Sequence, residues 1–375
     1  MSHEDNIPLF KVHMPANASD LVAETLNSGY ISEGEKVKLF EKGLQDFIGC
    51  RDILTVNSCT SAITLSLAHA GVGYGDDVVT TPMSCVATNM PILSLGANVV
   101  WADINPNTGN ITADTLEAAI TPKTKAVCYV HWAGQPADID GIMRVARKHG
   151  IKVIEDAAHA LGSTYKGKMI GNHGDYVCYS FQAIKHLTTA DGGAIAMNGH
   201  SPEEVQRLLK MRWFGLDRAF ARSATKWEAD ISDIGFKMHM NDLNATLGLA
   251  QLPYADFIVQ SHMSNGKVLD KCVKNCLGIE LVNKLPDTES AYWIYTLLLS
   301  DASKRDAFAG YMQDLGIATN VVHVRNDKYS IFNNYKKYLP GVDYFCSRMI
   351  NIPCGWWLSG KHMDRIVKAL ENACF

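Results

Sequence analysis

Residues 125–158, KAVCYVHWAGQPADIDGIMRVARKHGIKVIEDAA, contain two short apolar runs separated by a helical pattern. KAVCYVHW (125–132) and IKVIEDAA (151–158) read as strands, and DIDGIMRVARKHG (138–150) reads as the helix between them. Two parallel strands need such a crossover, because a tight turn joins only antiparallel strands. The stretch therefore predicts an α/β fold with a parallel sheet.

The same alternation continues on both sides of this stretch. Apolar runs at residues 53–57, 78–81 and 98–104 are each followed by a helical pattern, and two further apolar runs occupy 177–181 and 194–197. Together these patterns predict one mostly parallel sheet. Ligands of such sheets bind at the carboxyl ends of the strands, so the residues that end these strands are the candidates for a site.

The last third of the chain has a different pattern. A helical region begins near Met240 and is broken or kinked at Pro253, because proline cannot continue the hydrogen-bond ladder of a helix. We therefore expect a domain boundary near residue 250, with a large domain over 1–250 and a small domain over 251–375. The small domain is predicted to be α+β, with strands at 279–285, 291–300, 318–324 and 349–353 and helices near 302–315 and 359–373.

Composition excludes several classes of protein. The chain has 375 residues, of which 47% are apolar and 20% charged, as in ordinary globular proteins. Its net charge is −4 and it has no run of Lys or Arg, which argues against a nucleic-acid partner. Residues 78–102 carry no charge, but Pro82, Pro91 and Gly96 are among the residues that interrupt them. We expect two buried strands around a helix there, and no membrane span.

The ten cysteines indicate the compartment. They are scattered over predicted strands and helices and no signal peptide precedes them, so we expect reduced thiols in a cytoplasmic protein. Cys272 and Cys276 form the only close pair in the sequence. A structural zinc site would need a second pair of Cys or His at matching spacing, and none follows, so we expect no metal site.

Two polar segments follow predicted strands. NSCTSA (57–62) joins a strand to a helix, where hydroxyl groups and free backbone N–H groups bind anions. Ser and Thr are also common helix caps, so this segment alone does not establish a phosphate site. VIEDAAHA (153–160) places Glu155 and Asp156 at the end of an apolar strand. A carboxylate there is a helix cap by default, and it can also hold a protonated ring nitrogen.

Lys185 is the third polar feature. It lies in the loop of CYSFQAIKHLTTADGGAIAM (178–197), between two apolar runs. Most loop lysines are solvated. An amine that forms a Schiff base, however, needs an apolar site that lowers its pKa. A phosphate cradle, an acidic partner for a ring nitrogen and a buried lysine are together the parts of a pyridoxal phosphate site.

The chain resembles the sugar-nucleotide aminotransferases of the DegT/StrS group, which have the PLP-dependent transferase fold type I of aspartate aminotransferase. This fold implies a mostly parallel seven-stranded sheet, a smaller C-terminal α+β domain, and a homodimer with shared active sites. The resemblance is carried by SGYISEG (28–34) with FE (40–41), NSCTSA, TTPMSCVATN (80–89), VHWAGQPADID (130–140), IEDAAHALGS (154–163), YSFQAIKHLTTADGGA (179–194) and GFKMHMNDLNATLG (235–248).

The resemblance implies roles for particular residues. Lys185 matches the lysine that forms a Schiff base with pyridoxal 5'-phosphate, and Asp156 matches the partner of the pyridine nitrogen. His159 stands where many relatives have Gln, near the phenolic oxygen of the cofactor. The residues that match phosphate contacts are Thr60, Ser61 and Ser180.

Two positions depart from the family pattern. Cys85 stands where some relatives stack an aromatic ring on the cofactor, and Lys237 stands where relatives often have an Asn that reaches the phosphate of the partner subunit. Either Lys237 or Asn241 can take that part. VHVRNDKYSIF (322–332) lies where the family binds its sugar nucleotide, and a solvated loop remains open as an alternative. The candidates there are His323, Arg325 and Lys328.

The resemblance implies an aminotransferase that uses glutamate to aminate a nucleotide-linked keto-deoxy sugar, at C4 of a 4-keto-6-deoxyhexose. Amination at C3 is the alternative, and a dehydratase of the same fold is a more distant one. Such dehydratases have His in place of the lysine, and His186 follows Lys185, but Ser-Phe, three residues and then Lys fits the aminotransferase pattern without a gap. A non-catalytic regulator would need a DNA-binding segment, which the sequence lacks.

Overall fold

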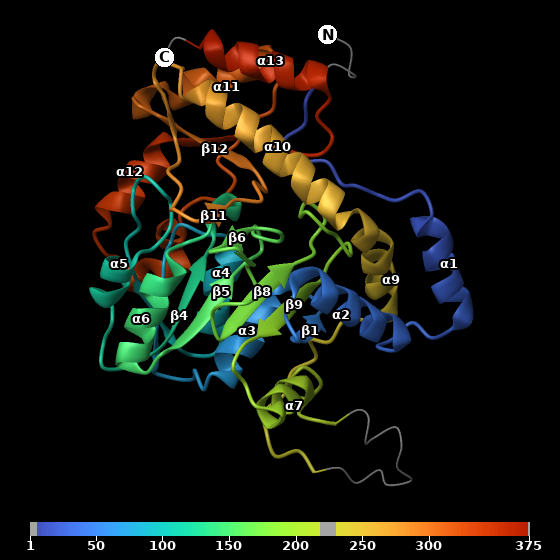
Figure 1. Ribbon diagram of the computed structural model, residues 1–375. Helices are drawn as coiled ribbons and strands as arrows, with labels where there is room; N and C mark the ends of the chain where they lie inside the picture. The colour runs from blue at the N-terminus through green and yellow to red at the C-terminus, as the bar shows by residue number, and fades with distance from the viewer. Residues whose placement is uncertain (1–5, 218–229, 374–375) are drawn as a thin grey trace.

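The computed structural model describes residues 6–217 and 230–373. Its centre is a seven-stranded sheet in the order β1-β9-β8-β5-β4-β2-β3 (Figure 1). β9 runs antiparallel to its neighbours β1 and β8, and the other neighbouring strands are parallel. The predicted α/β class with a mostly parallel sheet is confirmed. The strands are β1 (Asp52–Val56), β2 (Asp77–Thr80), β3 (Asn98–Trp101), β4 (Thr124–Val130), β5 (Lys152–Asp156), β8 (Tyr176–Ser180) and β9 (Gly193–Met197).

The crossover between β4 and β5 folds as its sequence predicts. The two strands pair in parallel, and helix α6 (Ile139–His149) connects them. The Asp138 side chain accepts a hydrogen bond from the Gly141 N–H at the start of the helix. Gly150 ends the helix with φ 65°, a left-handed conformation that glycine adopts without strain. The capping residues of this segment therefore specify where its helix begins and ends.

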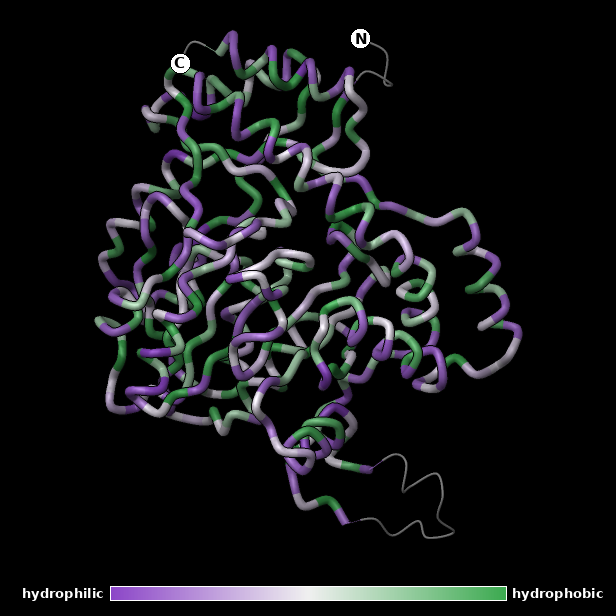
Figure 2. Tube along the Cα trace, in the orientation of Figure 1, coloured by the Kyte–Doolittle hydropathy of each residue, from purple (hydrophilic) through white to green (hydrophobic). Residues whose placement is uncertain are grey.

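The sheet is buried on both faces. Successive residues of β8 alternate between two buried apolar clusters, with Tyr176 and Cys178 in one and Val177 and Tyr179 in the other. Such double burial is typical of parallel sheets. In Figure 2, hydrophobic segments of the tube, in green, occur in this central region among white and purple ones. Further helices of this part of the chain are α3 (Cys59–His69), α4 (Val86–Ser94), α5 (Ala113–Glu117), η2 (Trp132–Gly134) and α7 (Pro202–Met211).

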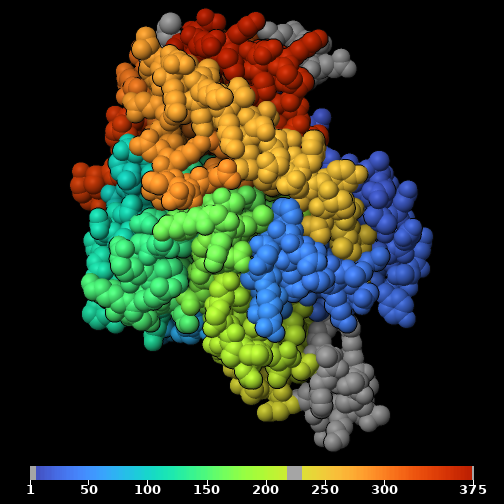
Figure 3. All heavy atoms as spheres, in the orientation of Figure 1, coloured from blue at the N-terminus to red at the C-terminus, as the bar shows by residue number. Residues whose placement is uncertain are grey.

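Two amino-terminal helices, which the sequence patterns did not predict, pack against α9 (Asp242–Gln251). They are α1 (Ala18–Ser28) and α2 (Glu35–Ile48), and Figure 3 shows them in blue beside the golden α9 and α10. The buried Asp242 carboxylate accepts hydrogen bonds from the N–H groups of Gly34 (2.8 Å) and Val37 (3.1 Å). A side chain distant in sequence therefore caps α2 and joins SGYISEG to GFKMHMND.

Beyond α9 the chain kinks and forms a second group of elements. The short helix η3 (Leu252–Tyr254) contains Pro253 and separates α9 from α10 (Ala255–Val273), which confirms the predicted break. The domain boundary near residue 250 remains a prediction. The other elements are an antiparallel sheet of β10 (Ile279–Leu281), β12 (Tyr295–Leu299) and β13 (Met349–Ile352), a small sheet of β6 (Thr164–Tyr165), β7 (Lys168–Met169) and β11 (Thr288–Glu289), and the helices η4 (Ala302–Lys304), α11 (Arg305–Asp314), η5 (Asn326–Lys328), η6 (Ser330–Tyr335), α12 (Pro340–Arg348) and α13 (Gly360–Glu371).

The strand expected at 318–324 is wrong. All of this segment is described, and it contributes only an isolated bridge between Asn320 and Asn351. Its apolar residues gave a strand-like pattern, but the chain leaves the edge of the small sheet after Asn320 and continues to η5, where the Asn326 N–H donates to the Pro82 carbonyl (2.9 Å). In the described part of the chain, no helix is both long enough and apolar enough to cross a membrane.

Asn326 fastens this loop to the segment between β2 and α4. Its side chain is fully buried, its amide donates to the Ser84 carbonyl (2.8 Å), and its oxygen accepts from the Asn89 amide (2.8 Å). Buried polar groups are costly when unpaired, so this network fixes the path of the chain on both sides of the contact. It thereby places His323, three residues earlier, beside His159 and Trp132.

We expect Asn326→Ala to lower the free energy of unfolding by about 3 kcal/mol, because it leaves the Ser84 carbonyl and the Asn89 amide buried without their partner. Urea unfolding followed by circular dichroism measures the change. Asn275→Ala is the matched control, since Asn275 is exposed, follows α10, and its side-chain amide donates to the Lys271 carbonyl. Equal losses in the two variants would contradict the anchoring role of Asn326.

Candidate active site

The candidate site forms at the carboxyl ends of β5, β8 and β1. Gly193 begins β9 and lies in register between Ser180 at the end of β8 and Val56 at the end of β1. A Cβ atom on Gly193 would lie 2.6 Å from the Cys59 nitrogen, which real Cβ atoms do not do. Only glycine therefore lets the start of α3 approach the end of β8, which brings NSCTSA toward Ser180.

The start of α3 is capped within the chain. The Ser58 side chain accepts from the Ser61 N–H (3.1 Å), and the Ser61 hydroxyl donates to the Asn57 side chain (2.6 Å). Thr60, which lies between Ser58 and Ser61 in the sequence, is partly exposed, and Ser180 is 9% exposed. The segment thus serves as a helix cap, and its contact with phosphate remains a prediction.

Asp156, the last residue of β5, is 4% exposed. Its carboxylate accepts hydrogen bonds from the Thr88 hydroxyl (2.6 Å) and the Ala158 N–H (3.0 Å). Both hydrogen bonds hold the carboxylate in one orientation. Asp156 therefore supplies a fixed negative charge at the floor of the site.

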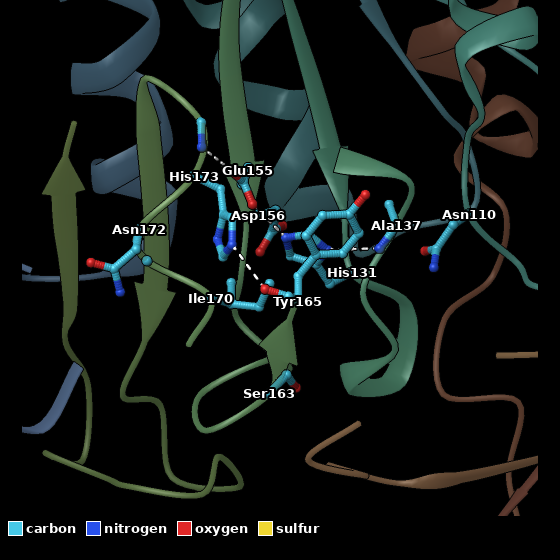
Figure 4. A network of polar contacts seen from close by, with 12 residues as sticks. Asn110, His131, Ala137, Glu155, Asp156, Ser163, Tyr165, Ile170, Asn172 and His173 are labelled. Carbon is cyan, nitrogen blue, oxygen red and sulfur yellow. Dashed lines mark hydrogen bonds and ion pairs between the residues drawn. The ribbon is translucent and has the colours of Figure 1, made fainter. Parts of the chain in front are cut away.

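The neighbouring Glu155 points to the opposite face of the strand and makes a separate network (Figure 4). One Glu155 oxygen lies 2.7 Å from Nε2 of His131, and the other accepts from the Gly174 N–H. The Ala137 N–H donates to Nδ1 of His131 (3.1 Å), so the proton of this imidazole lies on Nε2. The buried pair ties β4 to β5 and fixes the strand that carries Asp156.

The Lys185 side chain is half-buried, and its Nζ lies 3.8 Å from the centre of the Trp293 ring. Burial lowers the pKa of Lys185 to about 8, because desolvation disfavours the ammonium form, while the nearby Asp156 charge acts in the opposite direction. A neutral amine is therefore accessible near physiological pH.

His159 is 2% exposed and stacks on Trp293, with ring centres 3.8 Å apart. Its Nε2 faces Nε2 of His323 at 3.5 Å, and its Nδ1 has no hydrogen-bond partner among the described residues. Burial and the Lys185 charge lower the pKa of His159 well below its usual value. His159 is thus a neutral imidazole with one nitrogen left for a ligand.

The three candidates of the 322–332 segment have different surroundings. His323 reaches the site, and burial together with the Lys185 charge lowers its pKa to about 3. The Arg325 guanidinium forms ion pairs with Asp327 (2.6 Å) and with Asp343. Lys328 is exposed. The structure therefore brings His323 to Lys185 and leaves Lys328 in solvent.

The remaining candidates lie around this centre. Cys85 directly precedes α4 and is near enough to Lys185 to influence its charge. Lys237 lies over the Trp213 ring at 4.0 Å, and the Asn241 side chain caps α9 by accepting from the Asn244 N–H. Two further residues of the site, Thr88 and Trp293, were not among the candidates predicted from the sequence. Thr88 lies within the segment TTPMSCVATN, whereas nothing near Trp293 in the sequence indicates its contact with Lys185.

Comparison with known proteins agrees with this geometry. The model of the DegT/DnrJ/EryC1/StrS aminotransferase family matches residues 13–371. The chain belongs to this family. It is 34% identical to the spore coat polysaccharide biosynthesis protein SpsC of Bacillus subtilis, over 94% of this chain and 92% of that protein.

Two solved structures are similar along nearly the whole chain. The sugar aminotransferase CalS13 from Micromonospora echinospora is 34% identical, with a TM-score of 0.92 over 98% of this chain and 100% of that one. The PLP form of the putative sugar aminotransferase Spr1654 from Streptococcus pneumoniae is 28% identical, with a TM-score of 0.89 over 98% of each chain. The predicted fold type, cofactor and enzyme class are thus confirmed: the protein is a sugar aminotransferase that depends on pyridoxal phosphate.

The residues present fit this cofactor. A fixed carboxylate suits a protonated pyridine nitrogen, a half-buried amine suits a Schiff base, and the unpaired Nδ1 of His159 suits a contact with a cofactor oxygen. The residues that would hold the cofactor are the candidates predicted from the sequence. Among them, Asp156 would contact the ring nitrogen and Lys185 would form the Schiff base.

We expect Lys185 in the cofactor-free protein to attach pyridoxal phosphate faster as pH rises, with the rate levelling off above about pH 8, because the neutral amine is the nucleophile. A lysine with this pKa is about one-tenth neutral at pH 7, whereas an ordinary lysine is almost wholly charged. Stopped-flow absorbance measures the rate. A rate that still climbs tenfold for each pH unit beyond pH 9 would show an ordinary lysine.

Proposed function

We propose that this enzyme converts a nucleotide-linked 4-keto-6-deoxy sugar to the 4-amino-4,6-dideoxy sugar, with glutamate as the amino donor. The observation that supports it most directly is the half-buried Lys185 amine beside Asp156 and the neutral His159. The sugar class follows from the family, and the 4-keto group, the nucleotide and glutamate follow from the resemblance of the sequence.

The chain's own residues divide the work. When bound, pyridoxal phosphate supplies an electron sink for the carbon that gains or loses a proton. Asp156 would hold the ring nitrogen, and the hydroxyl groups of Thr60, Ser61 and Ser180 would bind the phosphate. Lys185 would hold the cofactor through its amine, and as a free amine it would move the proton at the substrate carbon, a task for which a pKa near 8 is suitable.

The position of His186 argues against a dehydratase. Its Nε2 donates to the Ala291 carbonyl (3.0 Å), and its ring packs edge-on against His262. Burial and the neighbouring His262 lower the pKa of His186 well below its usual value. His186 is thus a structural link to the segment before β12, and Lys185 is the side chain that faces Asp156 and His159.

For the substrate, the segment 322–332 offers two kinds of contact. His323 lies beside His159 and, being uncharged, can exchange a hydrogen bond with a sugar hydroxyl or carbonyl. Lys328 is exposed and can meet a pyrophosphate as a point charge, while Arg325 keeps the loop in place through its two carboxylate partners.

The test incubates the enzyme with pyridoxal phosphate, glutamate and either a 4-keto-6-deoxy or a 3-keto nucleotide sugar, and identifies the product by mass spectrometry and NMR. We expect a 4-amino sugar and 2-oxoglutarate, and we expect Lys185→Ala to fold but to lose at least about 100-fold in rate. Lys271→Ala, on an exposed helix position, is the control. A 3-amino product would show that amination occurs at C3 and not at C4. Loss of water from the sugar without use of glutamate would indicate a dehydratase.

We also propose that each site draws on two chains, with Lys237 or Asn241 contacting the phosphate bound by the partner subunit. The cradle of Thr60, Ser61 and Ser180 carries no cation for a dianion, and a contact shielded from solvent is stronger than in water. Lys237 belongs to the segment GFKMHMND, which leads into α9, and its side chain is exposed.

Mixing inactive Lys185→Ala chains with inactive chains substituted at both Lys237 and Asn241 tests this proposal. We expect activity to return in mixed dimers, because one of their two sites then receives only intact residues. Subunit exchange is confirmed by native mass spectrometry. No recovery despite exchange would mean that these residues serve their own chain.

A further inference from the structure

Trp293, a side chain from the carboxyl-terminal part of the protein, contacts three components of the site. It is 2% exposed. The Lys185 Nζ lies 3.8 Å from the centre of its ring, and its indole N–H donates to the Ile184 carbonyl (2.8 Å). His159 stacks on it with an angle of 9° between the rings. One indole thus contacts the amine, the peptide group that precedes Lys185 and the imidazole beside it.

The backbone that presents Trp293 is strained. Tyr292 has φ 45°, a left-handed conformation that is unfavourable for a bulky side chain. Its surroundings hold it there: the Tyr292 N–H donates to Ser290 Oγ (3.0 Å), its carbonyl accepts from His262 Nδ1 (2.9 Å), and its phenol donates to Asp270 (2.5 Å). Such strain persists only where several contacts determine it, and it is often found at functional positions.

The preceding residue attaches this turn to the loops around Lys185. The Ala291 N–H donates to Ser163 Oγ (3.0 Å), and the Ala291 carbonyl accepts from His186, the residue after the lysine. Gly134 packs behind the turn, where a Cβ atom would lie 3.0 Å from the Tyr292 nitrogen. The turn is thus fixed from both sides, and it sets Trp293 against the lysine and its loop.

We propose that Trp293 is the positioning residue of Lys185: its ring holds the free amine, and its N–H holds the loop that carries the lysine. The inference rests on the proposed role of Lys185 as the residue that bonds to the cofactor. A lysine that alternates between bonded and free forms needs a defined place for the free amine. An indole face attracts an ammonium group through its electron-rich ring, more strongly than a phenyl ring does.

Several groups face the Lys185 amine besides this ring. Burial opposes the ammonium form and Asp156 favours it, and Cys85 and Cys59 are the neighbouring thiols. Burial and the Lys185 charge lower the pKa values of the surrounding imidazoles, which are His159, His186 and His323. These imidazoles are neutral, so the ring and Asp156 are the groups that favour the ammonium form, and we expect removal of the ring to lower the pKa of Lys185.

The experiment uses the protein without cofactor, because the readout is Lys185 itself. Trp293→Leu removes the ring and the N–H, and Trp293→Phe keeps a weaker ring without the N–H. Trp101→Leu is the matched control: Trp101 is 1% exposed, ends β3 and packs edge-on against Phe332. Competitive acetylation across about pH 6 to 10, read by mass spectrometry of the Lys185 peptide, gives the midpoint of amine ionisation.

We expect the midpoint to fall by about one pH unit in Trp293→Leu and by less in Trp293→Phe. The rate of cofactor attachment at a pH above the midpoint is expected to fall at least about tenfold in Trp293→Leu, because the amine and its loop lose their fixed position. In Trp101→Leu we expect a lower stability, with the midpoint of ionisation and the rate of cofactor attachment unchanged.

Unchanged midpoint and attachment rate in Trp293→Leu, with a loss of melting temperature like that of Trp101→Leu, would overturn the proposal and leave Trp293 as a core residue. If Trp293→Leu does not fold, the same two readouts in Trp293→Phe decide. Borohydride reduction of the wild-type holoenzyme locates the bonded lysine. Attachment elsewhere contradicts the role of Lys185, while the midpoint comparison, which needs no cofactor, still judges the contact with Trp293.

Discussion

The carboxylate of Asp156, buried at the end of β5, is the constraint on which the rest of the site depends. A buried charge is tolerated only with hydrogen bonds and an opposite charge nearby, and Thr88, Ala158 and Lys185 supply them. The same carboxylate opposes the effect of burial on the lysine. The pKa near 8 is the balance of these two effects, and it leaves an amine that both accepts and releases a proton close to neutral pH.

Two adjacent carboxylates of similar chemistry have separate tasks because a strand turns successive side chains to opposite faces. Glu155 is paired with His131 and with the Gly174 N–H behind the sheet, where it fixes the strand. Asp156 faces the ligand side. The precision of the site thus depends on a polar network that a ligand does not reach, since any slip of β5 would exchange the two positions.

The carboxyl-terminal third takes part in the site through single side chains. Asn326 fastens the loop that carries His323, and Trp293 contacts Lys185. Asn326 and Trp293 are both buried, and each joins segments far apart in the sequence. The geometry of the site at the strand ends therefore depends on the position of the carboxyl-terminal elements, although these elements carry few of the family's motifs.

The sequence by itself determined the strand–helix–strand units, the helix ends at Asp138 and Gly150, and the position of Asp156 and Lys185 at strand ends, because periodicity and capping are local properties. It also determined the family, through motifs that lie on consecutive loops. It did not reveal α1 and α2, and its strand at 318–324 was wrong, since apolar residues alone do not say whether a strand partner is present. Only the tertiary structure decided that Arg325 is occupied by two carboxylates and that Trp293 lies against Lys185. Such contacts join residues far apart in the chain, and no local pattern encodes which distant side chains meet.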